Sequence, residues 1–195
     1  MSNFIPRNDV TTEYMKELRE KAVALALEKA GLNASNAVIR SLVIGSSTST
    51  DFHDLTYATE ATAGQEEWII DGAALTAGDL KNIISTTSGK QVSQISDNTA
   101  VVFYGVSDFS GSQDLTAVQF EKGASKIDFW NVQQMYGNDN KIGVGDNMVW
   151  YGPDDTVKLN FGLRAGASVV TGEDYQWMLL NVLVEPKSKS AAAAQ

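Results

Sequence analysis

The chain has 195 residues, of which 43% are hydrophobic and 20% charged, so it is long enough and apolar enough for one domain with a core. Acidic residues outnumber basic ones by 24 to 15, and the net charge of −9 argues against autonomous binding to the phosphate backbone of nucleic acids. The chain contains no cysteine, which excludes disulfides, thiolate metal sites and thiol nucleophiles.

The apolar runs of the sequence are short. Even the run 177–180 is far from the length that a transmembrane helix needs, so no membrane span is expected. The first residues lack the apolar core of a secretory signal peptide, so we expect synthesis in the cytoplasm.

The first predicted element is a helix that ends at Gly31. Thr11 or Thr12 can cap its start, and Glu13 suits the positively polarised first turn. Gly31 suits the left-handed conformation that ends many helices. Residues 1–34 are therefore predicted to form an N-terminal α-helical arm.

This helix carries one apolar stripe. Tyr14, Leu18, Ala22 and Leu25 follow helical spacing and fall on the same face. The stripe can pack on the sheet of its own chain, or it can dock on a neighbouring subunit, and the sequence leaves both arrangements open.

Beyond Gly31 the composition becomes typical of β-structure. Residues 38–44 form a short apolar stretch that we interpret as the first strand, with a helix as the competing interpretation. Short apolar runs separated by Gly, Ser, Thr, Asn and Asp then continue to Pro186. The strands predicted from these runs are 66–71, 99–106, 115–121, 126–132, 147–151, 156–163 and 175–184.

Alternation of side chains is clearest in one of these strands. Val157, Leu159, Phe161 and Leu163 place every second residue on one face. A hairpin is predicted where strands 115–121 and 126–132 meet at a short turn, Lys122–Gly123–Ala124.

The fold class that follows is all-β. Short strands with turn residues between them predict an antiparallel β-sandwich or jelly roll over residues 35–186. Only residues 75–84 could form a helix after Gly31, beginning near Thr76. Strand 175–184 is apolar on both faces, which predicts a central or covered position, and residues 187–195 are predicted to form a disordered tail.

Signals for catalysis and metal binding are weak. His53 is the only histidine, and it lies beside aspartates in a segment that we interpret as a loop, whereas a metal cluster usually needs more histidines or thiolates. The stretch 138–146 resembles a calcium loop, but Ile142 and Val149 occupy positions that need ligands, so we interpret it as a turn. We therefore predict no catalytic, cofactor or metal residue, and leave an irregular calcium site in the loops of residues 138–155 open.

Aromatic residues give the strongest functional signal. Phe129–Trp130 and Trp150–Tyr151 lie in predicted strands, where alternation points neighbouring rings to opposite faces. Such rings can stack on sugars, fill the core or form a subunit interface. If both faces carry large rings, one face needs cover from the helix or from another subunit. The predicted interface residues are Tyr14, Leu18, Leu25, Phe129, Trp130, Trp150 and Tyr151.

The second half of the chain resembles the small single-jelly-roll capsid proteins of icosahedral viruses that contain an internal membrane. The resemblance rests on residues 115–132, on the run 150–159 and on the last apolar strand ending at 183–186. It covers about a third of the chain and contains no diagnostic motif.

The resemblance implies a non-enzymatic structural protein of the virion, a capsid or decoration subunit. Its partners would be further copies of itself and other virion proteins, with peripheral contact to an internal viral membrane. The protein would be made in the host cytoplasm. The alternative prediction is a carbohydrate-binding β-sandwich module, and an enzyme is not expected.

Overall fold

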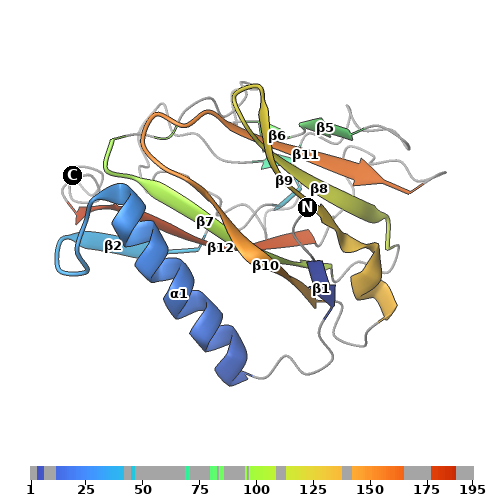
Figure 1. The fold of residues 1–195 in the computed structure, drawn as a ribbon, viewed down its shortest axis with the longest axis horizontal. Coiled ribbons are helices and arrows are strands. Elements are labelled where there is room, and N and C mark those ends of the chain that lie inside the picture. The colour runs from blue at the N-terminus through green and yellow to red at the C-terminus, as the bar shows by residue number, and fades with distance from the viewer. Residues whose placement is uncertain are drawn as a thin grey trace.

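The computed structural model describes residues 4–6, 12–41, 45–46, 69–70, 80–82, 84–85, 95, 97–108, 113–137, 142–164 and 177–187. Within these residues the chain is mainly β-structure. Two antiparallel sheets pack as a sandwich, and the N-terminal helix α1 (Thr12–Ala30) packs on one of them (Figure 1). This confirms the predicted antiparallel β-sandwich with an N-terminal helix.

Each sheet has a defined strand order. The five-stranded sheet has the order β1 (Phe4–Pro6), β10 (Ile142–Tyr151), β7 (Ala100–Asp108), β12 (Trp177–Pro186), β2 (Ala37–Arg40). The four-stranded sheet has the order β5 (Leu80–Asn82), β11 (Val157–Leu163), β8 (Leu115–Lys122), β9 (Ser125–Asn131). The remaining elements are the short strands β3 (Gly45–Ser46), β4 (Ile69–Ile70) and β6 (Ile84–Ser85), which pair with one another, and the 3-10 helix η3 (Val132–Gly137).

The predicted hairpin and alternation are confirmed. Strands β8 and β9 pair antiparallel around a turn in which Gly123 has a φ of +58°, a conformation that favours glycine. In β11, the four alternating residues Val157, Leu159, Phe161 and Leu163 are all buried in the core between the two sheets. Strand β12 pairs on both sides, with β7 and β2, as its apolar character predicts.

Helix α1 ends as its sequence predicts and packs within its own chain. Gly31 has a φ of +66°, and the Leu32 N–H donates to the Leu27 carbonyl at 3.0 Å, which completes a Schellman cap. The residues at the centre of the buried helix face have small side chains: Ala22, Ala26 and Ala30 lie against the five-stranded sheet.

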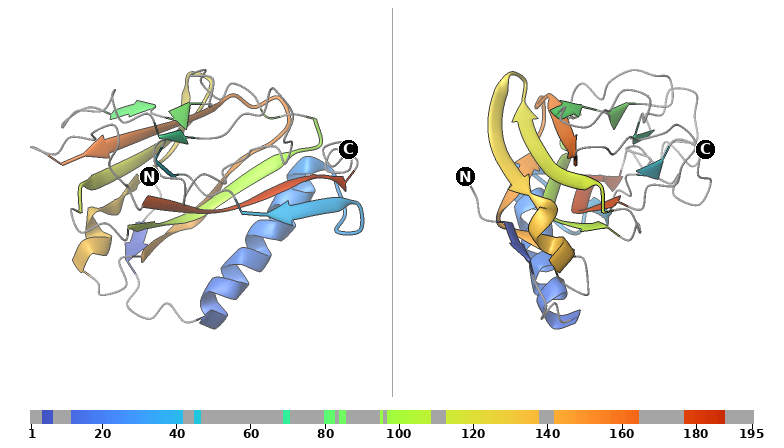
Figure 2. Two further views of the ribbon diagram at one scale, coloured as in Figure 1. Left: turned by 180° about the vertical axis from the view of Figure 1, so that it is seen from behind. Right: turned by 90° about the vertical axis from the view of Figure 1, so that its right-hand side faces the viewer.

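The molecule therefore has three layers, seen edge-on in Figure 2. The main core lies between the two sheets, and a second apolar layer lies between the five-stranded sheet and α1. Of the two arrangements that the sequence left open, the helix adopts packing on the sheet of its own chain. Strand β1 also pairs with β10. These parts of the N-terminal segment therefore belong to the sandwich rather than to a free arm. No helix in the described residues is long and apolar enough to cross a membrane.

Two sequence predictions are wrong. Within the predicted helix 75–84, the described residues 80–82 form strand β5, because they pair with the edge of β11. Within the predicted turn 138–146, residues 142–146 belong to β10, because they extend the pairing of that strand with β7. His53 and all of the predicted tail except Lys187 lie outside the described residues.

Candidate functional site

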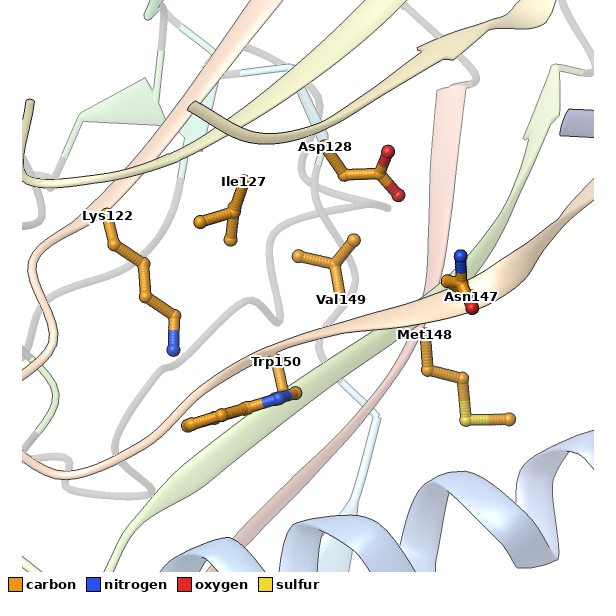
Figure 3. A pocket seen from close by; sticks show the side chains of 7 residues that line it. All are labelled: Lys122, Ile127, Asp128, Asn147, Met148, Val149 and Trp150. Atoms are coloured by element: carbon orange, nitrogen blue, oxygen red, sulfur yellow. The ribbon is translucent and has the colours of Figure 1, made fainter. Parts of the chain in front are cut away.

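The candidate site begins with an extra residue in β9, the edge strand of the four-stranded sheet. Asp128 is paired with Phe120 and Lys126 with Glu121, so Ile127 has no partner of its own in β8. This is a β-bulge, which bends a strand and changes the direction of its side chains. Ile127 and Asp128 are both turned toward strand β10 as a result (Figure 3).

Strand β10 contains a larger irregularity opposite this bulge. Val144 pairs with Gly105 and Val149 with Phe103, so four residues of β10 stand opposite the single residue Tyr104. The irregular stretch begins at Gly145, where an added Cβ would lie 2.8 Å from the Trp130 ring. The indole therefore requires glycine at this position.

The two irregular segments line a pocket of about 400 Å³ between β9 and β10, a volume within the range of small-ligand sites. Ile127 and Val149 point toward one another across it, and Lys122 reaches toward the Trp150 ring (Figure 3). The lining residues are Lys122, Ile127, Asp128, Asn147, Met148, Val149 and Trp150.

The ammonium groups of two lysines lie over the Trp150 ring. The Lys122 Nζ lies 3.3 Å from the centroid of the Trp150 ring, and the Lys29 Nζ lies 4.7 Å from it, which are cation–π distances. Lys122 also forms an ion pair of 2.7 Å with Asp155. Trp150 thus connects the end of α1 with the β8–β9 hairpin.

Asp128 is oriented by two hydrogen bonds of its own segment. Its Oδ1 accepts the Phe129 backbone N–H at 2.8 Å, and its Oδ2 accepts the Trp130 Nε1–H at 3.1 Å. The second bond satisfies the only polar atom of an indole that is otherwise buried in the core.

Among the described residues, the exposed large hydrophobic side chains are Ile127 and Phe129, at 40% and 38% exposure. Both lie on β9, where Ile127 lines the pocket and Phe129 pairs with Gln119 on the outer face of the sheet. The sequence predicted Phe129 as a contact residue but missed Ile127, because the bulge that exposes it leaves no mark in the alternation of the sequence. We call Ile127 and Phe129, with the flanking charges Lys126 and Asp128, the β9 strip.

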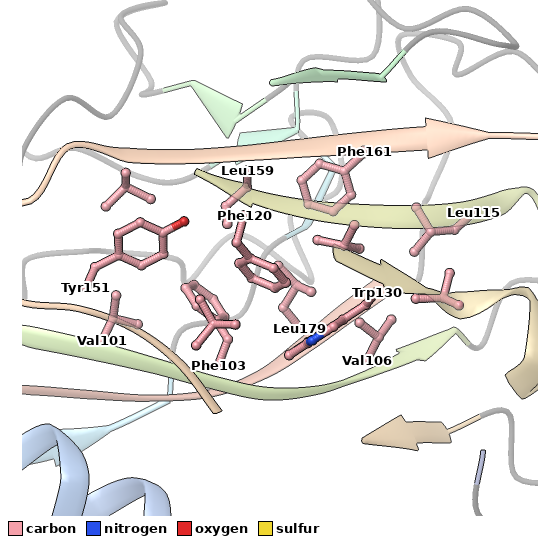
Figure 4. Packing of buried hydrophobic residues seen from close by; sticks show 14 of the residues in the cluster. Val101, Phe103, Val106, Leu115, Phe120, Trp130, Tyr151, Leu159, Phe161 and Leu179 are labelled. Atoms are coloured by element: carbon pink, nitrogen blue, oxygen red, sulfur yellow. The ribbon is translucent and has the colours of Figure 1, made fainter. Parts of the chain in front are cut away.

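Trp130 and Tyr151 are fully buried between the sheets (Figure 4). The Trp130 ring packs against Phe120 at a centroid distance of 4.5 Å, and the Tyr151 ring meets Phe103 edge-on at 6.2 Å. The structure thus corrects the prediction that these two are contact residues. They fill the core of their own chain and present no surface to a partner.

The Tyr151 hydroxyl joins the two sheets. It lies 3.0 Å from the Glu121 carbonyl oxygen and 3.3 Å from the Lys158 carbonyl oxygen, both in the four-stranded sheet. Burial raises the pKa of Tyr151 well above its ordinary value of 10, so the hydroxyl keeps its proton.

The remaining predicted contact residues lie on the helix side of the molecule. Leu18, Leu25 and Trp150 are partly buried and pack in the apolar layer between α1 and the five-stranded sheet, and Tyr14 is also half-buried. The sequence predicted that one face of the strand carrying Trp150 and Tyr151 needs cover. On the Trp150 side, helix α1 provides that cover.

A polar cluster lies on the other face of β8. The Glu121 carboxylate accepts hydrogen bonds from Lys158 at 2.6 Å, from Asn160 at 2.9 Å and from Gln119. The bond from Lys158 is the main cause that lowers the pKa of Glu121 below its ordinary value. In the described part of the chain, no three His, Cys, Asp or Glu side chains are grouped so that they could hold a metal ion.

Comparisons of the chain with protein-family models, curated proteins and solved structures found no match.

Proposed function

We propose that this chain is a structural subunit that assembles with further copies of itself and does not act as an enzyme. The observation that carries the proposal is the β9 strip. Two large apolar side chains are exposed on an edge strand, beside a pocket, and they are the exposed large hydrophobics among the residues whose side chains the structure describes. Exposed apolar side chains at a sheet edge are typical of contact surfaces between proteins.

We further propose that the sandwich is a jelly roll. The strand order supports this. Strands β2, β12, β7 and β10 are neighbours in one sheet, and β5, β11, β8 and β9 are neighbours in the other. Between β7 and β12 the chain passes from sheet to sheet at every step except the β8–β9 hairpin. Two four-stranded antiparallel sets connected in this way are the arrangement expected of two Greek keys.

A jelly roll is used by viral capsid proteins, lectins and cupins alike, so the fold supports more than one function. Together with the sequence resemblance and the β9 strip, it favours a capsid or decoration subunit of a virion. The partners would then be copies of this chain and other virion proteins, with peripheral contact to an internal viral membrane.

Electron microscopy of the purified protein tests this proposal. A capsid subunit is expected to form tiles, rings or closed shells as the concentration rises, because repeated weak contacts act together in a closed assembly. Single particles of one chain at every concentration and salt condition would contradict the proposal.

The alternative function is carbohydrate binding. One observation favours it: the pocket combines the Trp150 ring with the carboxylate of Asp128 and the amide of Asn147, which are groups that can contact sugar hydroxyls. The position of Lys122 over the Trp150 ring disfavours it, since stacking of a sugar would have to displace that ammonium group from its side of the indole. Screening on a glycan array, with Trp150→Ala as the comparison, would decide it.

A further inference from the structure

We propose that copies of this chain join head to tail, with the Phe129 ring of one copy seated in the pocket between β9 and β10 of the next copy. This inference rests on the proposed function, because it names the partner and the two surfaces of one assembly contact.

Strand pairing places these two surfaces on opposite faces of the same edge strand. Phe129 pairs with Gln119, which the alternation of β8 turns away from the core, because its neighbour Phe120 is buried there. Lys126 pairs two residues further along β8 and therefore lies on the same outer face as Phe129. Ile127 is turned the other way, toward β10, where it lines the pocket (Figure 3).

The pocket is large enough for a phenyl ring. A dry apolar cavity of about 150 Å³ holds benzene, and this pocket has a volume of about 400 Å³. Ile127 and Val149 point toward one another across it, so an inserted ring would meet apolar side chains from both strands (Figure 3). Insertion would cover Phe129 of one copy and Ile127 of the next, which are exposed at 38% and 40% in the single chain. Burial of such apolar surface is the main favourable term in most protein association.

Charged side chains beside the two surfaces favour a second copy as the occupant. Lys126 lies next to Phe129 on the outer face of the sheet. Asp146 directly precedes Asn147, which lines the pocket. Lys126 and Asp146 are both exposed, and neither forms an ion pair within the described residues. An incoming Phe129 therefore brings an unpaired cation to a pocket that has an unpaired anion beside it.

The placement on opposite faces gives the contact a direction. A two-fold contact turns the same surface of both copies toward each other, whereas here the ring of one copy meets the pocket of another. Each copy can insert its ring into one neighbour and receive a ring from a second neighbour. A head-to-tail contact of this kind produces a closed ring or an open filament. Asp128 keeps the hydrogen bonds to its own segment, because the contact makes no use of its carboxylate.

Disulfide trapping tests the contact directly, because the chain has no cysteine of its own. The double variant Lys126→Cys with Asp146→Cys places one thiol on each side of the contact, at exposed positions. With oxidised glutathione, we expect a ladder of covalent dimers, trimers and larger species. Each single variant is expected to stay largely uncoupled, because a head-to-tail contact does not bring the same position of two copies together.

The matched control is the double variant Lys126→Cys with Glu17→Cys, whose second thiol lies on the exposed face of α1. It carries the same number of thiols and is expected to give far less of the ladder. Thermal unfolding of each variant in the reduced state shows whether it is folded. Equal ladders from the two double variants would overturn the contact, and so would the absence of a ladder from the first.

Two other variants test the direction of the contact. Phe129→Ser removes the ring and keeps the pocket, whereas Ile127→Arg places a charged side chain in the pocket and keeps the ring. Either variant alone should lose the contact. An equimolar mixture should recover one contact per pair of chains, so its mass in light scattering should exceed the mean of the two separate variants. No gain in mass on mixing would overturn the head-to-tail arrangement.

The inference and the proposed function fail in different ways. If the unmodified protein forms tiles, rings or shells but the first double variant gives no ladder, the head-to-tail contact is wrong and the structural function stands. A ladder without any such assembly of the unmodified protein would support the contact and contradict the capsid function. If neither a ladder nor any assembly forms, both are overturned.

Discussion

Replacement of Tyr151 by phenylalanine tests how the two sheets are held together. The ring is fully buried, and its hydroxyl lies 3.0 Å from the Glu121 carbonyl oxygen and 3.3 Å from that of Lys158. Phenylalanine keeps the edge-on contact with Phe103 and removes only the hydroxyl. The change therefore isolates one hydrogen-bonding group that crosses from the five-stranded to the four-stranded sheet.

The expected loss follows from the hydrogen bond and its surroundings. A typical buried hydrogen bond contributes about 0.5–1.5 kcal/mol, and a buried acceptor left without its donor costs about 1–3 kcal/mol. We expect Tyr151→Phe to lower the free energy of unfolding by about 1–2 kcal/mol, which corresponds to roughly 2–8 °C in Tm for a chain of this size.

Chemical denaturation and calorimetry at pH 7 measure this loss, and Tyr151→Leu, which removes the ring as well, should lose clearly more. The pH dependence gives a second readout. Because folding raises the pKa of Tyr151, the unfolded chain releases the proton first, so stability is fully present below pH 10 and falls as the pH rises beyond it. The phenylalanine variant should show a shallower fall. An unchanged stability with an unchanged alkaline slope would refute the role of the hydroxyl.

Three further predictions concern other parts of the fold. Gly145→Ala should lower stability by about 1–3 kcal/mol, measured by denaturation, because its Cβ would lie 2.8 Å from the Trp130 ring; a neutral result would contradict this packing. Ala26→Leu should lower the stability by about as much, since Ala26 is fully buried between α1 and the five-stranded sheet. Lys21→Leu, at an exposed position of the same helix, should lower the stability only a little. Glu121→Gln should flatten the acid side of the stability curve: folding lowers the pKa of Glu121, so its contribution is present above about pH 4.5 and lost as the pH falls, and an equally steep acid loss in the variant would argue against the cluster.

Much of the fold could be predicted from local patterns. The alternation in β11 and the glycine turn at Gly123 are local signals, and each predicted its element correctly because the buried face coincided with the apolar face. The helix end at Gly31 is a signal of the same kind. Leu80–Asn82 was predicted wrongly as helix, because the edge of β11 that pairs with it lies far away in the sequence.

The candidate site was predicted only in part. Phe129 was found because strand alternation sets it opposite Trp130, and the same alternation could not say that Trp130 fills the core. Ile127 was missed because its exposure comes from a bulge, which depends on how β9 aligns with β8. The pocket needs a second irregularity, in β10, so no single segment of the sequence encodes it.

We propose that the chain works by self-assembly through the β9 strip. The most direct test is the molar mass in solution, measured by light scattering over a range of concentrations, for the unmodified protein and for the double variant Ile127→Ser with Phe129→Ser. We predict that the mass of the unmodified protein rises above the 21.0 kDa of one chain while the double variant, equally folded, stays closer to that value. A mass of 21.0 kDa at every concentration for the unmodified protein, or identical behaviour of the two proteins, would contradict the claim.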